Sequence, residues 1–240
     1  MLCELRIYHP MPGRLDDLVQ RIGAVMLPFF ERHGFAPRLG LWTGVAGWPT
    51  PVFAWMLRWP SLEARMAAFV ALGADAEWNA VRLRTNGPGE MVRRYDLRLL
   101  APSRAGASLG PELRVPACGL YEVRTLGVAV GRTRAVEEVL AAVDLPALAS
   151  TGTVVAGVFD NIFGGATPGV TLLLGWPDFT RRREALAAYE RWPEVSQARC
   201  RERERWAGEH LFGEATSLLL EPADSGAIDL QIPLFPRKTP

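Results

Sequence analysis

The side chains best suited to binding a small molecule in this sequence belong to Arg6, Tyr8, His9, Trp42 and Trp55. A guanidinium holds an anionic or carbonyl-bearing ligand through paired hydrogen bonds. A histidine beside it can act as a base or as an axial haem ligand. Indole rings suit a flat apolar ligand. These residue types predict a pocket for a small apolar or aromatic compound.

The arginine also has a structural interpretation. Glu4 precedes Arg6 by two positions, and Glu122 precedes Arg124 in the same way. Residues two apart share one face of a strand, so each glutamate can pair with its arginine. An ion pair required by the fold is favoured over a ligand site because the pattern occurs twice.

The tryptophans divide by whether they recur later in the chain. Core packing is favoured for those that recur, which are Trp59, Trp78, Trp176 and Trp192. Phe159 and Leu172 replace Trp42 and Trp55, so the latter two are the better pocket candidates. Function can differ where the two parts of the chain differ.

The three histidines, His9, His33 and His210, are far apart in the sequence. No two of them have the spacing of a metal site on one element, so no metal site is predicted and the cofactor stays open. For His9, a partly exposed turn position is favoured over a catalytic role. Gly164 and Gly165 lie between two strand-like segments, which favours a hairpin loop over a phosphate cradle.

The chain contains an internal repeat. Glu4-Leu5-Arg6 reappears as Glu122-Val123-Arg124, and Trp59-Pro60-Ser61 reappears as Trp176-Pro177-Asp178, in the same order. A linker rich in Pro, Gly, Ser and Ala separates the copies. We therefore predict a first half, a second half and a tail, over residues 1–104, 117–222 and 223–240.

Each half alternates between the two hydrophobic periods. In the first half, strand-like alternation covers residues 3–8, 39–45, 52–59 and 91–100. Helical spacing covers 14–33 and begins again after Ser61, a good N-cap. This order predicts an α+β fold of tandem ferredoxin-like (βαββαβ) repeats. Their apolar sheet faces would bury each other, face to face or curled into a barrel.

The first half resembles the NIPSNAP family of the dimeric α/β-barrel superfamily in several short motifs, namely Glu4-Leu5-Arg6-Ile7-Tyr8, Pro12-Gly13, Gly40-Leu41-Trp42, Trp55 to Trp59 with Ser61 and Arg65, and Glu77-Trp78. A thinner version continues in the second half, where Leu126 stands in place of Tyr8. The resemblance implies an intrachain dimeric α/β-barrel. It also implies an undefined role in bacterial members, beside monooxygenases, haem-degrading enzymes and isomerases in the wider superfamily. Fold likeness assigns no reaction.

Composition narrows the classes of partner. Lys plus Arg number 27 against 26 Asp plus Glu, which gives a net charge of +1 and no basic field for nucleic acid or anionic lipid. No apolar run reaches the roughly 18 residues of a membrane helix. Three distant cysteines, Cys3, Cys118 and Cys200, fit a reducing compartment. A cytoplasmic location is expected.

The tail carries a strand-like pattern. Apolar residues alternate with polar or proline positions at Ile228, Leu230, Ile232 and Leu234. We expect the tail to run extended over the protein surface or onto a second chain, and the latter would give a homodimer.

Two functions of different kinds follow. The first is binding or transforming a small apolar or aromatic molecule in a pocket between the sheet and the helices of the first half, lined by Arg6, Tyr8, His9, Trp42 and Trp55. The second is a non-catalytic protein-interaction module, and haem binding or a small monooxygenase is a third alternative. An enclosed pocket with convergent polar groups would favour the first function, whereas a filled interior would favour the second.

Overall fold

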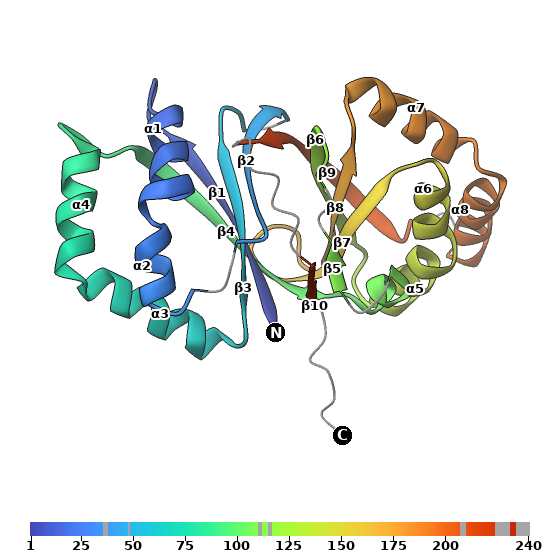
Figure 1. Ribbon diagram of the computed structural model, residues 1–240. Helices are drawn as coiled ribbons and strands as arrows, with labels where there is room; N and C mark the ends of the chain where they lie inside the picture. Colours follow the sequence, from blue (N-terminus) through green and yellow to red (C-terminus); the bar gives the residue numbers. More distant parts are fainter. Residues whose placement is uncertain are drawn as a thin grey trace.

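A computed structural model of the chain describes all residues except 36–37, 48, 110–111, 115–116, 207–209, 224–230 and 234–240. Its centre is a closed antiparallel barrel in which the strands follow the order β1-β3-β2-β9-β6-β8-β7-β4 (Figure 1). The bounds are β1 Leu2–Pro10, β2 Gly40–Ala46, β3 Phe53–Trp59, β4 Val92–Pro102, β6 Leu120–Val128, β7 Val154–Phe163, β8 Gly169–Trp176 and β9 Phe212–Pro222. The α+β class and the barrel are confirmed.

Each half contributes four strands in the same spatial order. This order is β4-β1-β3-β2 in the first half and β9-β6-β8-β7 in the second, and the halves join where β2 meets β9 and where β4 meets β7. The register also corresponds, because Arg6 lies opposite Trp55 on the neighbouring strand and Arg124 lies opposite Leu172. Equivalent positions in the two halves can therefore be compared directly.

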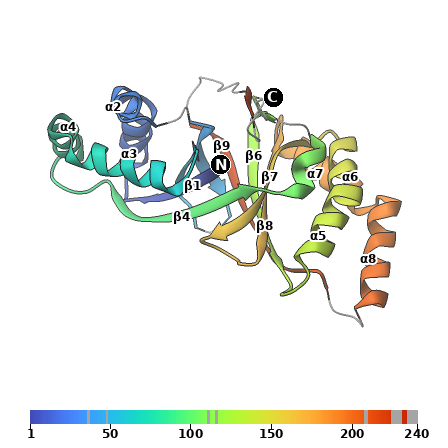
Figure 2. The same cartoon turned by 90° about the horizontal axis from the view of Figure 1, so that it is seen from below.

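The helices form two outer layers on opposite sides of the barrel (Figures 1 and 2). The first layer consists of α1 Leu15–Gln20, the π-turn η1 Arg21–Val25, α2 Leu27–Arg32, α3 Leu62–Ala74 and α4 Ala76–Asn86. The second consists of α5 Thr133–Val139, the π-turn η3 Leu140–Asp144, α6 Leu145–Ser150, α7 Phe179–Glu190 and α8 Pro193–Arg205. A π-turn interrupts the first helical segment of each half.

The second helical segment begins as predicted but is broken. The Ser61 hydroxyl accepts a hydrogen bond from the Ala64 amide at 3.2 Å and so caps α3. The helix stops at Ala74 because Asp75 adopts an extended conformation and caps α4 instead, accepting from the Trp78 amide at 3.0 Å. The helical spacing of the sequence does not reveal this break.

The barrel interior is filled by apolar side chains of both halves. Alternate residues of β1, namely Cys3, Leu5 and Ile7, point inward and meet Tyr121 and Val123 of β6. An eight-stranded barrel is just wide enough for side chains to fill it. The two sheets therefore bury each other, as the sequence predicted.

Short elements occupy the linker and the tail. The 3-10 helix η2 spans Arg104–Leu109, β5 spans Glu112–Arg114 and β10 spans Gln231–Pro233. β10 pairs antiparallel with β5, placing Ile232 opposite Leu113 on the neighbouring backbone. This part of the tail is extended over its own chain. Ile228, Leu230 and Leu234 lie outside the described residues, and the homodimer stays a prediction.

Two further expectations concern loops and membranes. Gly164 and Gly165 lie in the β7–β8 connection with φ of 81° and 82°, which confirms the hairpin loop. A side chain at Gly164 would also collide with the backbone oxygen of Leu97. None of the helices in the described part of the chain has both the length and the apolar character needed to cross a membrane.

Candidate functional site

The five predicted site residues fall on two different faces of the sheet. Arg6 and Tyr8 of β1 point toward the helices, where Trp55 lies beside them. Trp42 belongs to the barrel interior, and His9 lies on the same face of β1 as the inward-pointing residues. The structure therefore brings together Arg6, Tyr8 and Trp55, and separates them from His9 and Trp42.

Side chains of the protein surround the Arg6 guanidinium. Its Nε donates to the Tyr8 hydroxyl at 3.0 Å and its Nη1 donates to Glu4. Its Cζ lies 4.7 Å from the centroid of the Phe69 ring and 5.3 Å from that of Trp55, distances typical of cation–π contacts. Arg6 is only 6% exposed. Its Nε and Nη1 are thus engaged within the protein, and a role of Arg6 in ligand binding stays a prediction.

The buried carboxylate of Glu4 binds Arg6 and two further side chains. Its carboxylate accepts from Arg65 Nη2 at 2.7 Å and from Trp59 Nε1 at 2.8 Å, in addition to Arg6. Burial opposes ionisation, but the hydrogen bond from Arg65 and the charges of both arginines outweigh it and lower the pKa of Glu4. The ion pair predicted from the Glu-x-Arg pattern is confirmed.

His9 and Trp42 take part in barrel contacts. His9 Nε2 lies 2.9 Å from Asp96 Oδ2 and 3.1 Å from Arg94 Nη2. The Trp42 ring lies 5.6 Å from the ring of Tyr121, which belongs to the other half. His9 is 3% exposed, so it is more buried than a turn histidine would be.

The second half has a cavity of about 150 Å³ between its sheet and its helices. This is the place that Tyr8 and Trp55 occupy in the first half. The cavity is lined by Arg124, Leu126, Leu140, Asp144, Leu148, Leu172, Tyr189, Arg199 and Phe212. Its walls therefore combine an apolar majority with a few polar groups, as in most small-molecule sites.

Arg124 forms the polar part of the sheet side. Its Nε donates to Glu122 Oε1 at 2.7 Å, and Arg182 Nε donates to Glu122 Oε2 at 2.7 Å. Burial opposes ionisation of Glu122, but the two arginines outweigh it and lower its pKa. Among the described residues, none accepts a hydrogen bond from the Nη atoms of Arg124. Two donor groups of this guanidinium are thus available to a ligand.

Asp144 forms the polar part of the helix side. Its Oδ1 accepts from the Tyr189 hydroxyl and from Arg199 Nη2, both at 2.6 Å. Its Oδ2 is buried and has no hydrogen-bond partner among the described residues. Burial and the neighbouring Asp144 raise the pKa of Tyr189, which keeps that phenol protonated at neutral pH.

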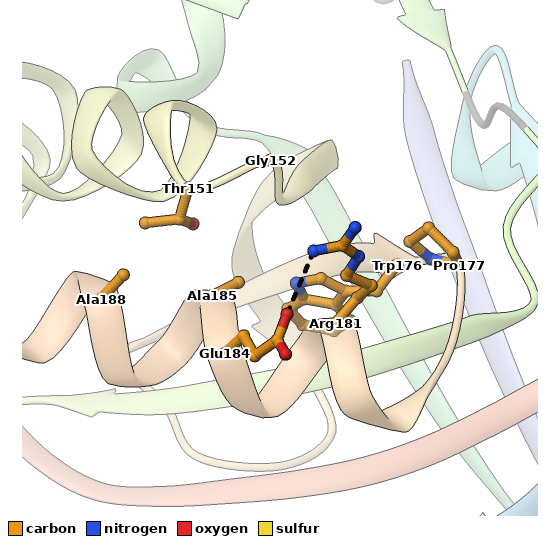
Figure 3. A pocket seen from close by; sticks show the side chains of 8 residues that line it. All are labelled: Thr151, Gly152, Trp176, Pro177, Arg181, Glu184, Ala185 and Ala188. Carbon is orange, nitrogen blue, oxygen red and sulfur yellow. Dashed lines mark hydrogen bonds and ion pairs between the residues drawn. The ribbon is translucent and has the colours of Figure 1, made fainter.

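A larger hollow of about 340 Å³ lies at the surface between the end of α6 and α7 (Figure 3). Its polar groups, Arg181 and Glu184, bond each other at 3.1 Å, and their side chains are 68% and 54% exposed. Paired, solvated charges of this kind hold a ligand weakly. The cavity beside Arg124 is the better candidate despite its smaller volume.

Asp144, Tyr189 and Arg199 are not among the site residues predicted from the sequence. They lie on helical segments far apart in the sequence, where each is typical of a solvated helix face. The available signal was the replacement of large residues by small ones, because Leu126 and Leu172 stand where Tyr8 and Trp55 do. Smaller side chains on a shared framework leave space.

Comparison with known proteins agrees with this architecture. The sequence profile of the NIPSNAP family matches residues 3–105. No curated protein matches the chain.

Three solved structures share the fold over almost the whole chain. A proposed monooxygenase from Lactobacillus acidophilus has a TM-score of 0.56 at 10% identity, covering 95% of this chain and 98% of its own. One from Fusobacterium nucleatum has a TM-score of 0.50 at 6% identity, covering 95% and 96%. A chlorite dismutase variant from Candidatus Nitrospira defluvii has a TM-score of 0.50 at 8% identity, covering 93% and 92%. Identities this low show the fold alone. The NIPSNAP match is therefore confined to residues 3–105, in the first half of the chain, and the solved structures add the barrel fold.

Proposed function

We propose that this protein binds a small molecule with a mainly apolar body in the cavity between the sheet and the helices of the second half. The observation that carries the proposal is that Arg124, whose Nη atoms have no acceptor among the described residues, and Asp144 line the same mainly apolar cavity. A cavity of about 150 Å³ holds a molecule near the size of benzene. The proposal keeps the predicted type of pocket and moves it to the other half.

The two halves are, in this proposal, copies of one ferredoxin-like unit that have diverged. Equal strand order, corresponding registers, a π-turn at the same place and the repeated Glu-x-Arg pair support a shared origin. Duplication leaves one copy free to change while the other maintains the barrel. The cavity arises in the copy whose aromatic side chains have been replaced.

The proposal concerns binding and names no reaction. The activities in the names of the structural neighbours belong to those proteins, since likeness of fold does not transfer chemistry. A protein-interaction module is the second candidate, and the filled barrel interior favours it. Binding in the cavity and docking on the surface are separable by experiment.

Haem does not fit the cavity. Its volume of about 150 Å³ is well below the roughly 300–1,000 Å³ of pockets for larger organic ligands. No histidine lines it, and its phenol, Tyr189, is bonded to Asp144. Of the histidines elsewhere, His9 lies within hydrogen-bond distance of Asp96, and His33 of Asp75.

Ligand-detected NMR with a set of benzene-sized fragments tests the proposal. We expect the protein to bind several of them, and Leu172→Trp to weaken binding at least about tenfold because the ring fills the cavity. Leu83→Trp places the same ring on an exposed position and serves as the control. Failure of all fragments to bind the unmodified protein would refute the proposal. Undiminished binding by folded Leu172→Trp would do the same.

A further inference from the structure

We infer that the ligand of this cavity carries both an anionic group and a hydrogen-bond donor on a small apolar body, which describes an amphoteric compound such as an aminobenzoate. The inference rests on the proposed function and specifies the chemical class of the ligand. It follows from the unequal charge on the two sides of the cavity.

The sheet side has an excess of positive charge. Glu122 is the only carboxylate in the described contacts of Arg124 and Arg182, so two guanidiniums share one negative charge. The third donor to Glu122 is the neutral hydroxyl of Ser217, at 2.6 Å. A guanidinium with free Nη atoms binds a carboxylate through two parallel hydrogen bonds. The anionic end of a ligand is therefore expected at Arg124.

The helix side has the opposite balance. Asp144 and Glu202 share the single guanidinium of Arg199, whose Nη atoms lie 2.6 Å and 3.4 Å from their oxygens. Both carboxylate side chains are 3% exposed. Asp144 lines the cavity, so the excess negative charge of this side favours a hydrogen-bond donor on the ligand. An amine or hydroxyl is expected at this end.

The first half indicates that these polar groups are not required by the fold. Pro28 and Pro146 each occupy the second position of the helix after the π-turn, so Asp144 corresponds to Met26. The caps Ser61 and Asp178 likewise align Tyr189 with Leu72. Met26 and Leu72 are buried apolar residues. The second half thus has polar residues at two positions where the first half packs apolar ones.

Apolar side chains separate the two polar ends. They belong to Leu126, Leu140, Leu148, Leu172 and Phe212. A benzene-sized body fits a space of this volume. A ring with a carboxylate on one side and an amine on the other satisfies Arg124 and Asp144 together, whereas a ring with one of these groups leaves the other residue unsatisfied.

Calorimetric titration of the full chain with 3- and 4-aminobenzoate, benzoate, aniline and toluene tests the inference. We expect at least one aminobenzoate to bind about tenfold or more tightly than benzoate, since a hydrogen bond to a charged acceptor contributes that much. Asp144→Asn should reduce this advantage to about twofold. Arg124→Gln should make the affinity for the aminobenzoate equal to that for aniline, because the carboxylate loses its partner. Arg134→Gln, in an exposed ion pair outside the cavity, is the control and should bind like the unmodified protein.

The outcomes separate the inference from the function on which it rests. If none of the compounds binds, both fail. If toluene or benzoate binds as tightly as the aminobenzoates, the cavity binds ligands but the class inferred here is wrong. An aminobenzoate preference that persists in folded Asp144→Asn would also overturn the inference. Should that variant fail to fold, the ranking on the unmodified protein decides.

Discussion

Aromatic side chains occupy the space beside the strand arginine in the described part of the first half, whereas a cavity lies at the equivalent place in the second, although the strands of both halves have the same order. Around Arg6, the rings of Tyr8, Trp55 and Phe69 close over the guanidinium. Around Arg124, Leu126, Leu172 and Leu186 stand at the positions of these three rings, and a cavity remains. Side-chain volume on a shared backbone framework, rather than the framework itself, therefore creates the candidate site.

The buried ion pairs that occur in both halves stabilise the fold. Glu4 and Glu122 each bind two arginines from a strand and a helix, and both carboxylates are fully buried. A buried carboxylate with several donors fixes the position of a helix against a sheet. Features shared in this way are interpreted as requirements of the fold, and unshared ones as candidates for function.

The largest expected effect comes from neutralising the shared carboxylates. Glu4→Gln leaves buried guanidiniums uncompensated and should cost about 3 to 5 kcal/mol of unfolding free energy. Glu122→Gln should cost less, because its partners Arg124 and Arg182 are more exposed than Arg6 and Arg65. Urea denaturation measures both. Equal costs, or a greater cost at Glu122, would contradict the prediction that the more buried arginines of Glu4 make its loss more destabilising.

Reciprocal substitutions at one equivalent position should have unequal effects. Trp55→Leu opens a cavity in the first half and should destabilise the protein by about 2 to 4 kcal/mol. Leu172→Trp enters existing space and should change stability by less than about 1.5 kcal/mol. Denaturant unfolding with a check that the m-value is unchanged provides the measurement. A loss at Leu172 as large as that at Trp55 would mean that the cavity cannot accept a ring.

Acid should destabilise both halves through the same groups. The folded-state pKa values of Glu4 and Glu122 are lowered below 4.5 by their arginines. Their contribution is therefore complete above the unfolded-state pKa and is lost as the pH falls through the folded-state values. Melting temperatures between pH 7 and pH 2.5 should decline below about pH 4.5. Either Glu→Gln variant should show a shallower decline, and an unchanged pH profile would contradict this assignment.

The smallest effect is expected at the helix caps. Ser61 caps α3 and Asp178 caps α7, accepting amide hydrogen bonds of 3.2 Å and 2.8 Å. Replacement of either by alanine should cost about 1 kcal/mol. The loss should be slightly larger at Asp178, whose charge also interacts with the helix dipole. Thermal unfolding of both variants measures the two losses of stability. A larger loss for Ser61→Ala than for Asp178→Ala would contradict this prediction.

Local patterns in the sequence predict much of the fold. The alternation after Leu2 gives β1, the Ser61 cap gives the start of α3, and the repeated Glu-x-Arg pattern gives both buried ion pairs. The break at Asp75 was missed because helical spacing continues across it. Such a break depends on an extended backbone at one residue, which hydrophobic periodicity does not detect.

The candidate site was less predictable. Strand alternation already separates Tyr8 from His9, since neighbouring residues point to opposite faces, so a single pocket could not include both on one face. The faces of Trp42 and Trp55 depend on strand register, and the cavity depends on the summed volumes of side chains distant in sequence. Replacement of Trp55 by Leu172 predicts a loss of pocket lining in the second half, whereas in the structure it leaves space.

Methyl-resolved NMR during titration with an aminobenzoate tests the central claim most directly. We expect chemical-shift changes at the methyl groups of Leu126 and Leu172, and none at Leu57 and Leu72, which report on the equivalent region of the first half. Shifts confined to the first half or to the barrel interior at Leu5 and Leu173 would contradict it, as would the absence of any shift at saturating ligand.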